Sequence, residues 1–157
     1  MKRVPLLLLV LAALLSTAGT CETDLIEDAG FQLWCGERLC DWDLEEGEIR
    51  KVATWHTNDY AVELVGSPVL LSSPAARSAS STRVEVVSDI EEGADVAVQI
   101  DQEGDGAVDW VVLVPPSDGF VSQVWTSQPA VGDTGVFYVR KSGEGRAIIA
   151  RLRVSRD

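Results

Sequence analysis

The segment 95–115 constrains the fold of this chain more strongly than any other stretch of its sequence. Val96, Val98 and Ile100 alternate with polar or small residues, which is the two-residue period of a strand that buries one face. A second run of strand-forming residues, 108–114, follows a short acidic loop and ends at two prolines. Two such strands predict a hairpin, and a hairpin is stable only when further strands cover its apolar face.

The remainder of the sequence also favours strands over helices. Beyond the apolar start no stretch has a convincing helical period, whereas short apolar runs alternate with turns rich in Gly, Pro and Asp. This spacing predicts an all-β chain that folds as a single antiparallel β-sandwich over residues 21–157. In the closing strand we expect Ala150, Leu152 and Val154 to face the core. The further strands are predicted at 31–34, 49–54, 60–65, 69–71, 83–87, 120–125, 136–140 and 148–154.

Residues 1–20 have the pattern of an export signal. A basic start precedes an apolar run, 4–15, that is too short to span a bilayer, and small residues then lead to Cys21. A cysteine at this position predicts lipoprotein processing, in which diacylglycerol on the thiol anchors the mature chain to a membrane. Ordinary cleavage after Ala18 is the alternative. We therefore expect a cell-envelope protein, an outer-membrane lipoprotein facing the periplasm or the cell surface, or otherwise a secreted protein.

The three cysteines fit an oxidising compartment. Lipidation of Cys21 would leave Cys35 and Cys40 to pair, so that no thiol is left over. Their disulfide would close a short loop and contribute on the order of 2 kcal/mol. A metal site or a redox motif is the weaker alternative, because no second cysteine pair or nearby histidine completes a zinc site.

The chain is strongly acidic after the signal. All 25 acidic residues and 11 of the 13 basic residues follow position 20, so this part carries a net charge of −14. No basic patch could neutralise phosphates, and nucleic acid is therefore not an expected partner. Residues 22–48 hold ten acids and one base, whereas 140–156 hold six bases and one acid. We expect these two segments either to lie side by side or to form separate solvated faces.

Three segments of the chain follow, in order, the motifs of one known superfamily. They are the opening segment 29–34 with its continuation 39–47, the central segment 55–64, and the closing segment 143–154. Together they resemble the galactose-binding-like jelly rolls, especially the carbohydrate-binding modules found beside xylanases and cellulases. The resemblance covers about 25–157. It implies a jelly-roll fold and a non-catalytic module that binds carbohydrate.

The chain departs from the pattern of that superfamily at several positions. Gln32 replaces the usual acid after Gly-Phe, Asn58-Asp59 stands where Ser/Gly-x is usual, and Cys40 takes the place of a common proline. Ala150 occupies the position of an aspartate in the closing strand. In the family, backbone and acidic groups near both chain ends often hold a structural calcium. The absence of that aspartate argues against the family's calcium site in this chain.

The acidic hairpin loop supplies a separate candidate calcium site. Asp101, Glu103, Asp105 and Asp109, together with the backbone carbonyl of Ala107, offer hard oxygens at irregular angles around a tight turn. Ca²⁺ is therefore a possible cofactor of this loop. The flanking strands exclude an EF-hand. The alternative is a plain polar turn in which an Asp-Gly pair provides the positive φ angles.

Five tryptophans are many for a chain of this length. By the resemblance, Trp34, Trp42 and Trp125 correspond to core or strand-end positions. Trp55 and Trp110 are instead predicted to be exposed, and either could form a platform on which a sugar ring stacks.

His56 is the only histidine of the chain. No G-x-S-x-G or other catalytic signature accompanies it, so we expect it to pack and hydrogen-bond, and we do not expect an enzyme. The sequence predicts an exported, lipid-anchored binding module with carbohydrate as its ligand. The alternative is a structural or protein-interaction subunit with the same fold and no sugar ligand.

Overall fold

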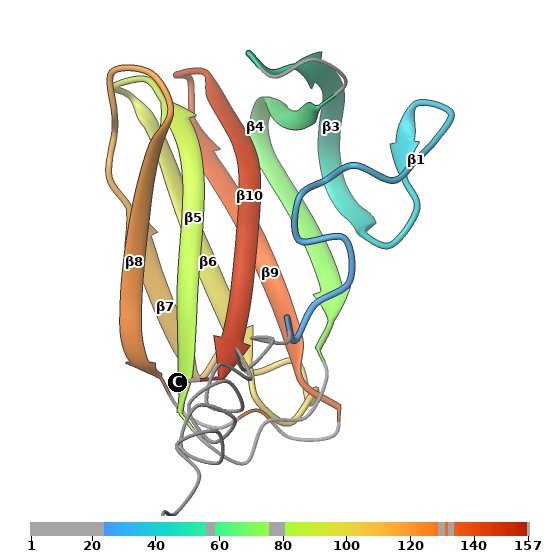
Figure 1. Cartoon of the computed structure of the whole chain (residues 1–157), viewed down its shortest axis with the longest axis vertical. Coiled ribbons are helices and arrows are strands. Elements are labelled where there is room, and N and C mark those ends of the chain that lie inside the picture. Colours follow the sequence, from blue (N-terminus) through green and yellow to red (C-terminus); the bar gives the residue numbers. More distant parts are fainter. Residues whose placement is uncertain (1–23, 56–58, 76–80, 129–130, 132–133, 157) are drawn as a thin grey trace, which may run out of the picture.

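The computed structural model describes residues 24–55, 59–75, 81–128, 131 and 134–156, and every regular element among them is a β-strand (Figure 1). The predicted signal, Cys21 and His56 lie outside these residues. In the described part of the chain no helix is long and apolar enough to cross a membrane. The strands are β1 (Trp34–Cys35), β2 (Arg38–Leu39), β3 (Asp43–Ala53), β4 (Tyr60–Pro74), β5 (Thr82–Ile90), β6 (Ala94–Asp101), β7 (Trp110–Val114), β8 (Val121–Gln128), β9 (Val136–Gly143) and β10 (Ala147–Arg156).

The described strands beyond β2 form one antiparallel sheet that folds over into two layers. Its order is β7-β6-β9-β4-β10-β5-β8, and β3 pairs with β4. The long strand β4 belongs to both layers, because residues 62–64 pair with β10 and residues 69–74 pair with β9. Figure 1 shows β10, β5 and β8 in front of β9, β6 and β7. This is the antiparallel jelly-roll sandwich that the sequence predicted.

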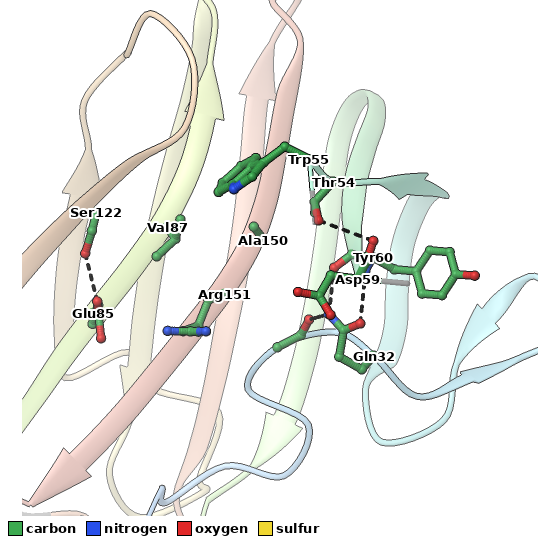
Figure 2. Close-up of a pocket in the computed structure, with 11 residues that line it drawn as sticks. Gln32, Thr54, Trp55, Asp59, Tyr60, Glu85, Val87, Ser122, Ala150 and Arg151 are labelled. Carbon is green, nitrogen blue, oxygen red and sulfur yellow. Dashed lines mark hydrogen bonds between the residues drawn. The ribbon is translucent and has the colours of Figure 1, made fainter. Parts of the chain in front are cut away.

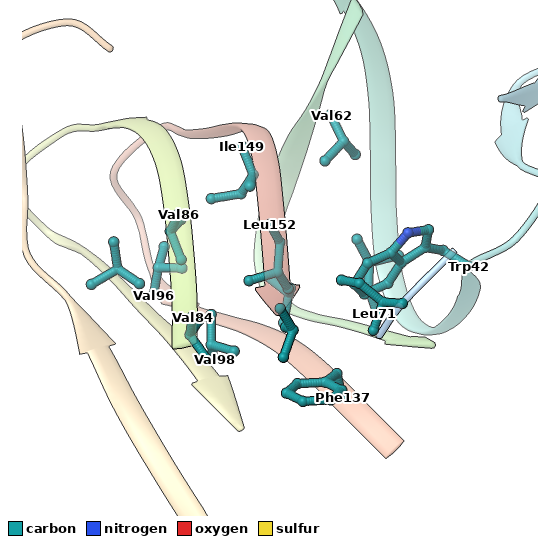
Figure 3. Close-up of a cluster of buried hydrophobic side chains, with 14 of the residues drawn as sticks. Trp42, Val62, Leu71, Val84, Val86, Val96, Val98, Phe137, Ile149 and Leu152 are labelled. Atoms are coloured by element: carbon teal, nitrogen blue, oxygen red, sulfur yellow. The ribbon is translucent and has the colours of Figure 1, made fainter. Parts of the chain in front are cut away.

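The core lies between the two layers and is built from alternating side chains (Figure 3). Val84 and Val86 of β5 are fully buried from the front layer, and Val98 of β6 is buried from the back layer. The predicted hairpin is confirmed, since Val98 pairs with Val112 of β7 and both face inward. Burial of each such side chain contributes roughly 1.5–3 kcal/mol.

The strand predicted at 31–34 does not form, except at its last residue. Asp28 and Phe31 have positive φ angles of 43° and 53°, so the chain turns sharply here instead of extending. The turn inserts Phe31 into the core, where its ring packs on Trp42 with the centroids 5.1 Å apart. The predicted disulfide between Cys35 and Cys40 is confirmed, and it closes the small β1–β2 hairpin.

Strands β3 and β4 are longer than the sequence predicted. β3 begins at Asp43 rather than at residue 49, and its acidic first half stays exposed along the edge of the sheet. Because exposed edge positions keep charged side chains in water, the acids do not prevent strand pairing there. β4 runs through both predicted strands, 60–65 and 69–71, and its middle residues pass from one layer to the other.

The two ends of the domain lie side by side, as one of the two charge-based alternatives predicted. The backbone of Leu25 donates a hydrogen bond to the carbonyl of Val154 at 2.6 Å. The Arg153 guanidinium contacts the Asp24 carboxylate at 2.8 Å. The acidic N-terminal segment is thus joined to the basic strand β10.

Candidate functional site

A pocket opens on the outer face of the front layer, over β10, β5 and β8 (Figure 2). Its volume is about 430 Å³, which is within the range of small-ligand sites. We call it the outer pocket. Its walls come from the N-terminal segment, the β3–β4 corner and these three strands, and they include Gln32, Trp55, Glu85, Ser122, Ala150 and Arg151.

A β-bulge in β10 sets the floor of the outer pocket. The register against β5 shifts between Ile149 and Arg151, and the extra residue is Ala150. Ile149 and Leu152 are both buried, so the bulge reverses the inward–outward alternation between them and turns Arg151 to the outer face. The prediction that Ala150 faces the core is therefore wrong. Its small side chain lines the pocket instead.

Trp55 stands at the rim of the outer pocket with 61% of its surface exposed. It follows β3, and its indole packs against Phe120 of the β7–β8 connection, with the ring centroids 4.6 Å apart. This contact braces an aromatic ring that remains open to solvent. The predicted exposure of Trp55 is confirmed, and its role as a ligand platform stays a prediction.

Hydrogen bonds order the polar walls of the pocket. The Ser122 hydroxyl donates to Glu85 Oε1 at 2.8 Å, which fixes this carboxylate over the strands (Figure 2). At the β3–β4 corner the Thr54 N–H donates to the Asp59 carbonyl at 3.1 Å. The pocket thus offers a braced aromatic ring, oriented oxygen atoms and one guanidinium, a combination that suits a ligand with both apolar and hydroxylated faces.

Gln32 occupies the position where the resembling family has an acid, and it links three backbone groups. Its Nε2 donates to the carbonyls of Gly30 at 2.5 Å and Tyr60 at 2.7 Å, and its Oε1 accepts the Tyr60 N–H at 2.9 Å. The Gln32 amide group donates hydrogen bonds to the carbonyl oxygens of Gly30 and Tyr60, so these oxygens are not available to a cation. Ala150 has no side-chain oxygen that could bind a cation. The residues present therefore do not fit the family's calcium site.

The acidic loop is organised by its own backbone. Asp101 is fully buried, and its carboxylate accepts N–H groups from Glu103, Gly104, Asp105 and Gly106 at 2.6–3.3 Å. Burial raises the pKa of Asp101, but these four hydrogen bonds together outweigh it and hold the pKa below its ordinary value.

The other acids of the loop also bind backbone groups. Asp109 accepts the Gln102 N–H at 2.7 Å, and Asp105 accepts the Ala107 N–H at 2.8 Å. Among the described residues, no group of three or more His, Cys, Asp or Glu side chains is arranged to hold a metal ion. The calcium site at this loop stays a prediction.

Trp110 does not line the outer pocket. It begins β7 beside the acidic loop and is partly buried against the core. Strand β6 runs parallel to β4, because both pair antiparallel with β9, so the end of β3 and the start of β7 lie at opposite ends of the sheet. The structure therefore separates Trp55 from Trp110. Trp42 is buried, and Trp34 and Trp125 pack partly buried against the core, as predicted.

The positions of Glu85, Ser122 and Arg151 in the pocket were not predicted from the sequence. The alternation of β5 does place Glu85 on an outward face, but pairing with β8 and β10 is needed to bring Ser122 and Arg151 beside it. No local sequence signal reports those pairings, and none marks the bulge at Ala150.

No family model and no curated protein matches the sequence. Solved structures with the same fold do match. The carbohydrate-binding module TmCBM61 in complex with β-1,4-galactotriose superposes with a TM-score of 0.61 at 15% identity, over 86% of this chain and 99% of that one. A carbohydrate-binding module from Cellvibrio mixtus lichenase 5A, in complex with cellotriose, gives 0.52 at 14% identity over 73% and 90%.

The fold also occurs inside a larger protein. The enzymatically active domain of bacteriophage CBA120 tailspike protein 4 gives a TM-score of 0.63 at 10% identity, over 85% of this chain but only 21% of that one. At these identities the similarity concerns the fold. The chain has the jelly-roll fold of the carbohydrate-binding modules.

Proposed function

We propose that this chain is a carbohydrate-binding module whose ligand binds in the outer pocket with a sugar ring against Trp55. The observation that carries the proposal is a largely exposed indole, braced by Phe120, at the rim of a pocket with ordered polar walls. The apolar face of a pyranose packs on an aromatic ring, while its hydroxyl groups need donors and acceptors nearby. Glu85 and Ser122 offer such groups on the pocket floor.

The module we propose is non-catalytic. Glycoside hydrolysis requires two carboxyl groups that flank the scissile bond, one of them a general acid. Of the two acids among the described lining residues of the outer pocket, Glu85 accepts the Ser122 hydroxyl on the surface of the sheet, whereas Asp59 lies at the β3–β4 corner. The absence of a catalytic signature in the sequence also supports binding without chemistry.

The proposed setting is the cell envelope. The apolar run before Cys21 supports export and lipidation of this cysteine, and the Cys35–Cys40 disulfide fits an oxidising compartment. In this setting the anchor would hold the chain at a membrane and leave the outer pocket open to glycans.

A protein-interaction subunit is the second candidate. Strands β7 and β8 are the ends of the strand order among the described residues, and each pairs with one neighbour. They expose Val111, Leu113 and Val124, with Leu113 73% exposed, and the sequence of β7 contains no charge. Uncharged, exposed edge strands are surfaces to which another protein can add a strand.

The experiment that separates the two candidates is a binding screen with matched variants. Soluble protein that begins after Cys21 is tested against a panel of plant, algal and bacterial polysaccharides by affinity electrophoresis, and each hit is measured by calorimetry. We expect Trp55→Ala to weaken binding about tenfold or more, because the stacking surface is lost. Trp55→Phe should retain most of the affinity.

Leu113→Ala is the matched control, because it removes an exposed apolar side chain from another surface and should not change glycan affinity. Failure of every polysaccharide to bind would reject the carbohydrate proposal and favour the protein-interaction candidate. Equal affinity of the wild type and Trp55→Ala would reject the outer pocket as the site.

A further inference from the structure

We propose that Arg151 makes the outer pocket selective for a sugar that carries a carboxylate group, that is, a uronate. This inference rests on the proposed function and specifies its ligand class. Arg151 is the cation among the described residues that line the pocket, and its side chain is exposed.

The Arg151 side chain differs from those of the neighbouring arginines in having no ion-pair partner among the described residues. Arg146 contacts Glu63 at 3.5 Å, and Arg153 contacts Asp24 at 2.8 Å. The guanidinium of Arg151 makes neither a hydrogen bond nor an ion pair with the described residues. In a chain with about twice as many acids as bases, this leaves a guanidinium available to a ligand.

The strand register explains why Glu85 does not neutralise Arg151. In the strand register Arg151 lies opposite the uncharged Val87 of β5, whereas Glu85 lies opposite Arg153. The Glu85 carboxylate accepts the Ser122 hydroxyl from the opposite side. The guanidinium of Arg151 therefore has no ion-pair partner in the part of the chain that the structure describes, although the Glu85 carboxylate lies two residues along the adjacent strand.

The bulge gives Arg151 its position in the pocket. If β10 kept a strict two-residue alternation after the buried Ile149, Arg151 would face the core, and the bulge at Ala150 turns it outward instead. Figure 2 shows Ala150 between Trp55 and Arg151. A sugar ring on Trp55 would therefore lie over a small side chain and direct one edge toward the guanidinium.

The chemistry of the guanidinium favours a carboxylate over a hydroxyl. Arg presents two parallel N–H groups that match the two oxygens of a carboxylate, and such charge-assisted pairs are stronger than neutral hydrogen bonds. A sulfate ester could use the same charge, but the planar fork fits a planar carboxylate best. The acidic net charge of the chain gives no long-range attraction for an anion, so selectivity must come from this contact.

The test uses matched oligosaccharides at 0.15 M salt, where long-range repulsion is screened within about 8 Å. Trimers of galacturonate, glucuronate and mannuronate are compared with their methyl esters and with their carboxyl-reduced forms by calorimetry. A sulfated galactose trimer is the separate arm for a sulfate ligand. We expect at least one uronate to bind about tenfold more tightly than both of its neutral forms.

Arg151→Gln should abolish this preference, because it weakens uronate binding more than binding of the neutral forms, while Arg151→Lys should retain part of the preference. Arg140→Gln is the matched control, because it makes the same change of net charge at an exposed position of β9 in the other layer. Thermal melting checks that every variant is folded.

Three outcomes would overturn the inference. They are equal affinity for a neutral form and its uronate across all three sugars, a preference that survives in Arg151→Gln, and tighter binding of the sulfated trimer than of any uronate. In each of these cases a neutral, sulfated or uronate glycan still binds, and the proposed function stands. If no polysaccharide of the wider panel binds, the proposed function itself fails.

Discussion

Asn in place of Asp101 should destabilise the hairpin loop by a predictable amount. Asp101 Oδ1 accepts a short N–H contact from Gly104 at 2.6 Å and two longer ones, and Oδ2 accepts the Gly106 N–H at 2.7 Å. The amide of Asn can accept on one side only. Its NH₂ group would face the N–H of Gly106 or of Gly104, so one short hydrogen bond is lost and the rest become neutral.

The magnitude follows from these contacts. A hydrogen bond to a charged group contributes about 1.5–3 kcal/mol and a neutral one about 1 kcal/mol. Because the loop that covers Asp101 is itself exposed, we use the low end of this range and expect a loss of about 2 kcal/mol. For a domain of this size, such a loss lowers Tm by roughly 8 °C. Urea unfolding at pH 7 should give the same difference through a lower midpoint with an unchanged slope.

The pH dependence gives the sign of the effect. Because the folded pKa of Asp101 lies below its unfolded value of about 3.9, the carboxylate stabilises the fold above that pH. This stability is lost as the pH falls through the folded pKa. The difference between wild type and Asp101→Asn should therefore be full at pH 6–7 and shrink below about pH 4.

Asp109→Asn is the control for the Asp101 prediction, because the Asp109 side chain is exposed and accepts one N–H contact. Its cost should stay below about 1 kcal/mol. The proposed stabilisation by the Asp101 carboxylate is wrong if Asp101→Asn is as stable as the wild type. It is also wrong if the difference in stability does not change between pH 7 and pH 3.

Three further predictions concern the anchor, the core and the loop. Cys21→Ser should release the protein from the membrane fraction and abolish lipid labelling, and an unchanged membrane fraction would contradict lipidation. Lys141→Met should lower the free energy of unfolding, measured in urea, by about 2 kcal/mol, because the buried ammonium donates hydrogen bonds to the carbonyls of Gly66 and Gly143. A variant as stable as the wild type would show that these hydrogen bonds contribute no stability. Millimolar calcium should raise Tm by a few degrees in the wild type but not in Asp105→Ala. If calcium does not change the melting curve of the wild type, the loop is a polar turn without a calcium site.

The fold could be predicted because its strongest signals are local. The alternation of Val96, Val98 and Ile100 fixes which face of the hairpin is buried, and the two prolines after Val114 end the second strand. The failure at 31–34 also has a local cause, since residues with side chains seldom adopt the positive φ angle seen at Phe31, and nothing in the sequence marked it.

The site was less predictable because it depends on pairings between distant strands. Exposure was predicted for both Trp55 and Trp110, but Trp110 begins the apolar strand β7 and packs partly buried against the core. The bulge at Ala150 reverses which residues of β10 face outward, and a strict two-residue period cannot show this. Charge segregation left two alternatives open, and the contact between Arg153 and Asp24 agrees with the one in which the N-terminal segment lies beside β10.

Binding of a sugar in the outer pocket is tested most simply by finding which tryptophan the sugar contacts. Each of the five tryptophans provides an indole N–H signal in a ¹H–¹⁵N NMR spectrum, and Trp55→Phe identifies the signal of Trp55. On titration with the best-binding oligosaccharide, we expect a saturable change in the chemical shift of the Trp55 signal. The signals of the buried Trp42 and the distant Trp110 should not shift. A saturable shift of Trp110 with Trp55 unmoved would contradict the outer pocket as the binding site.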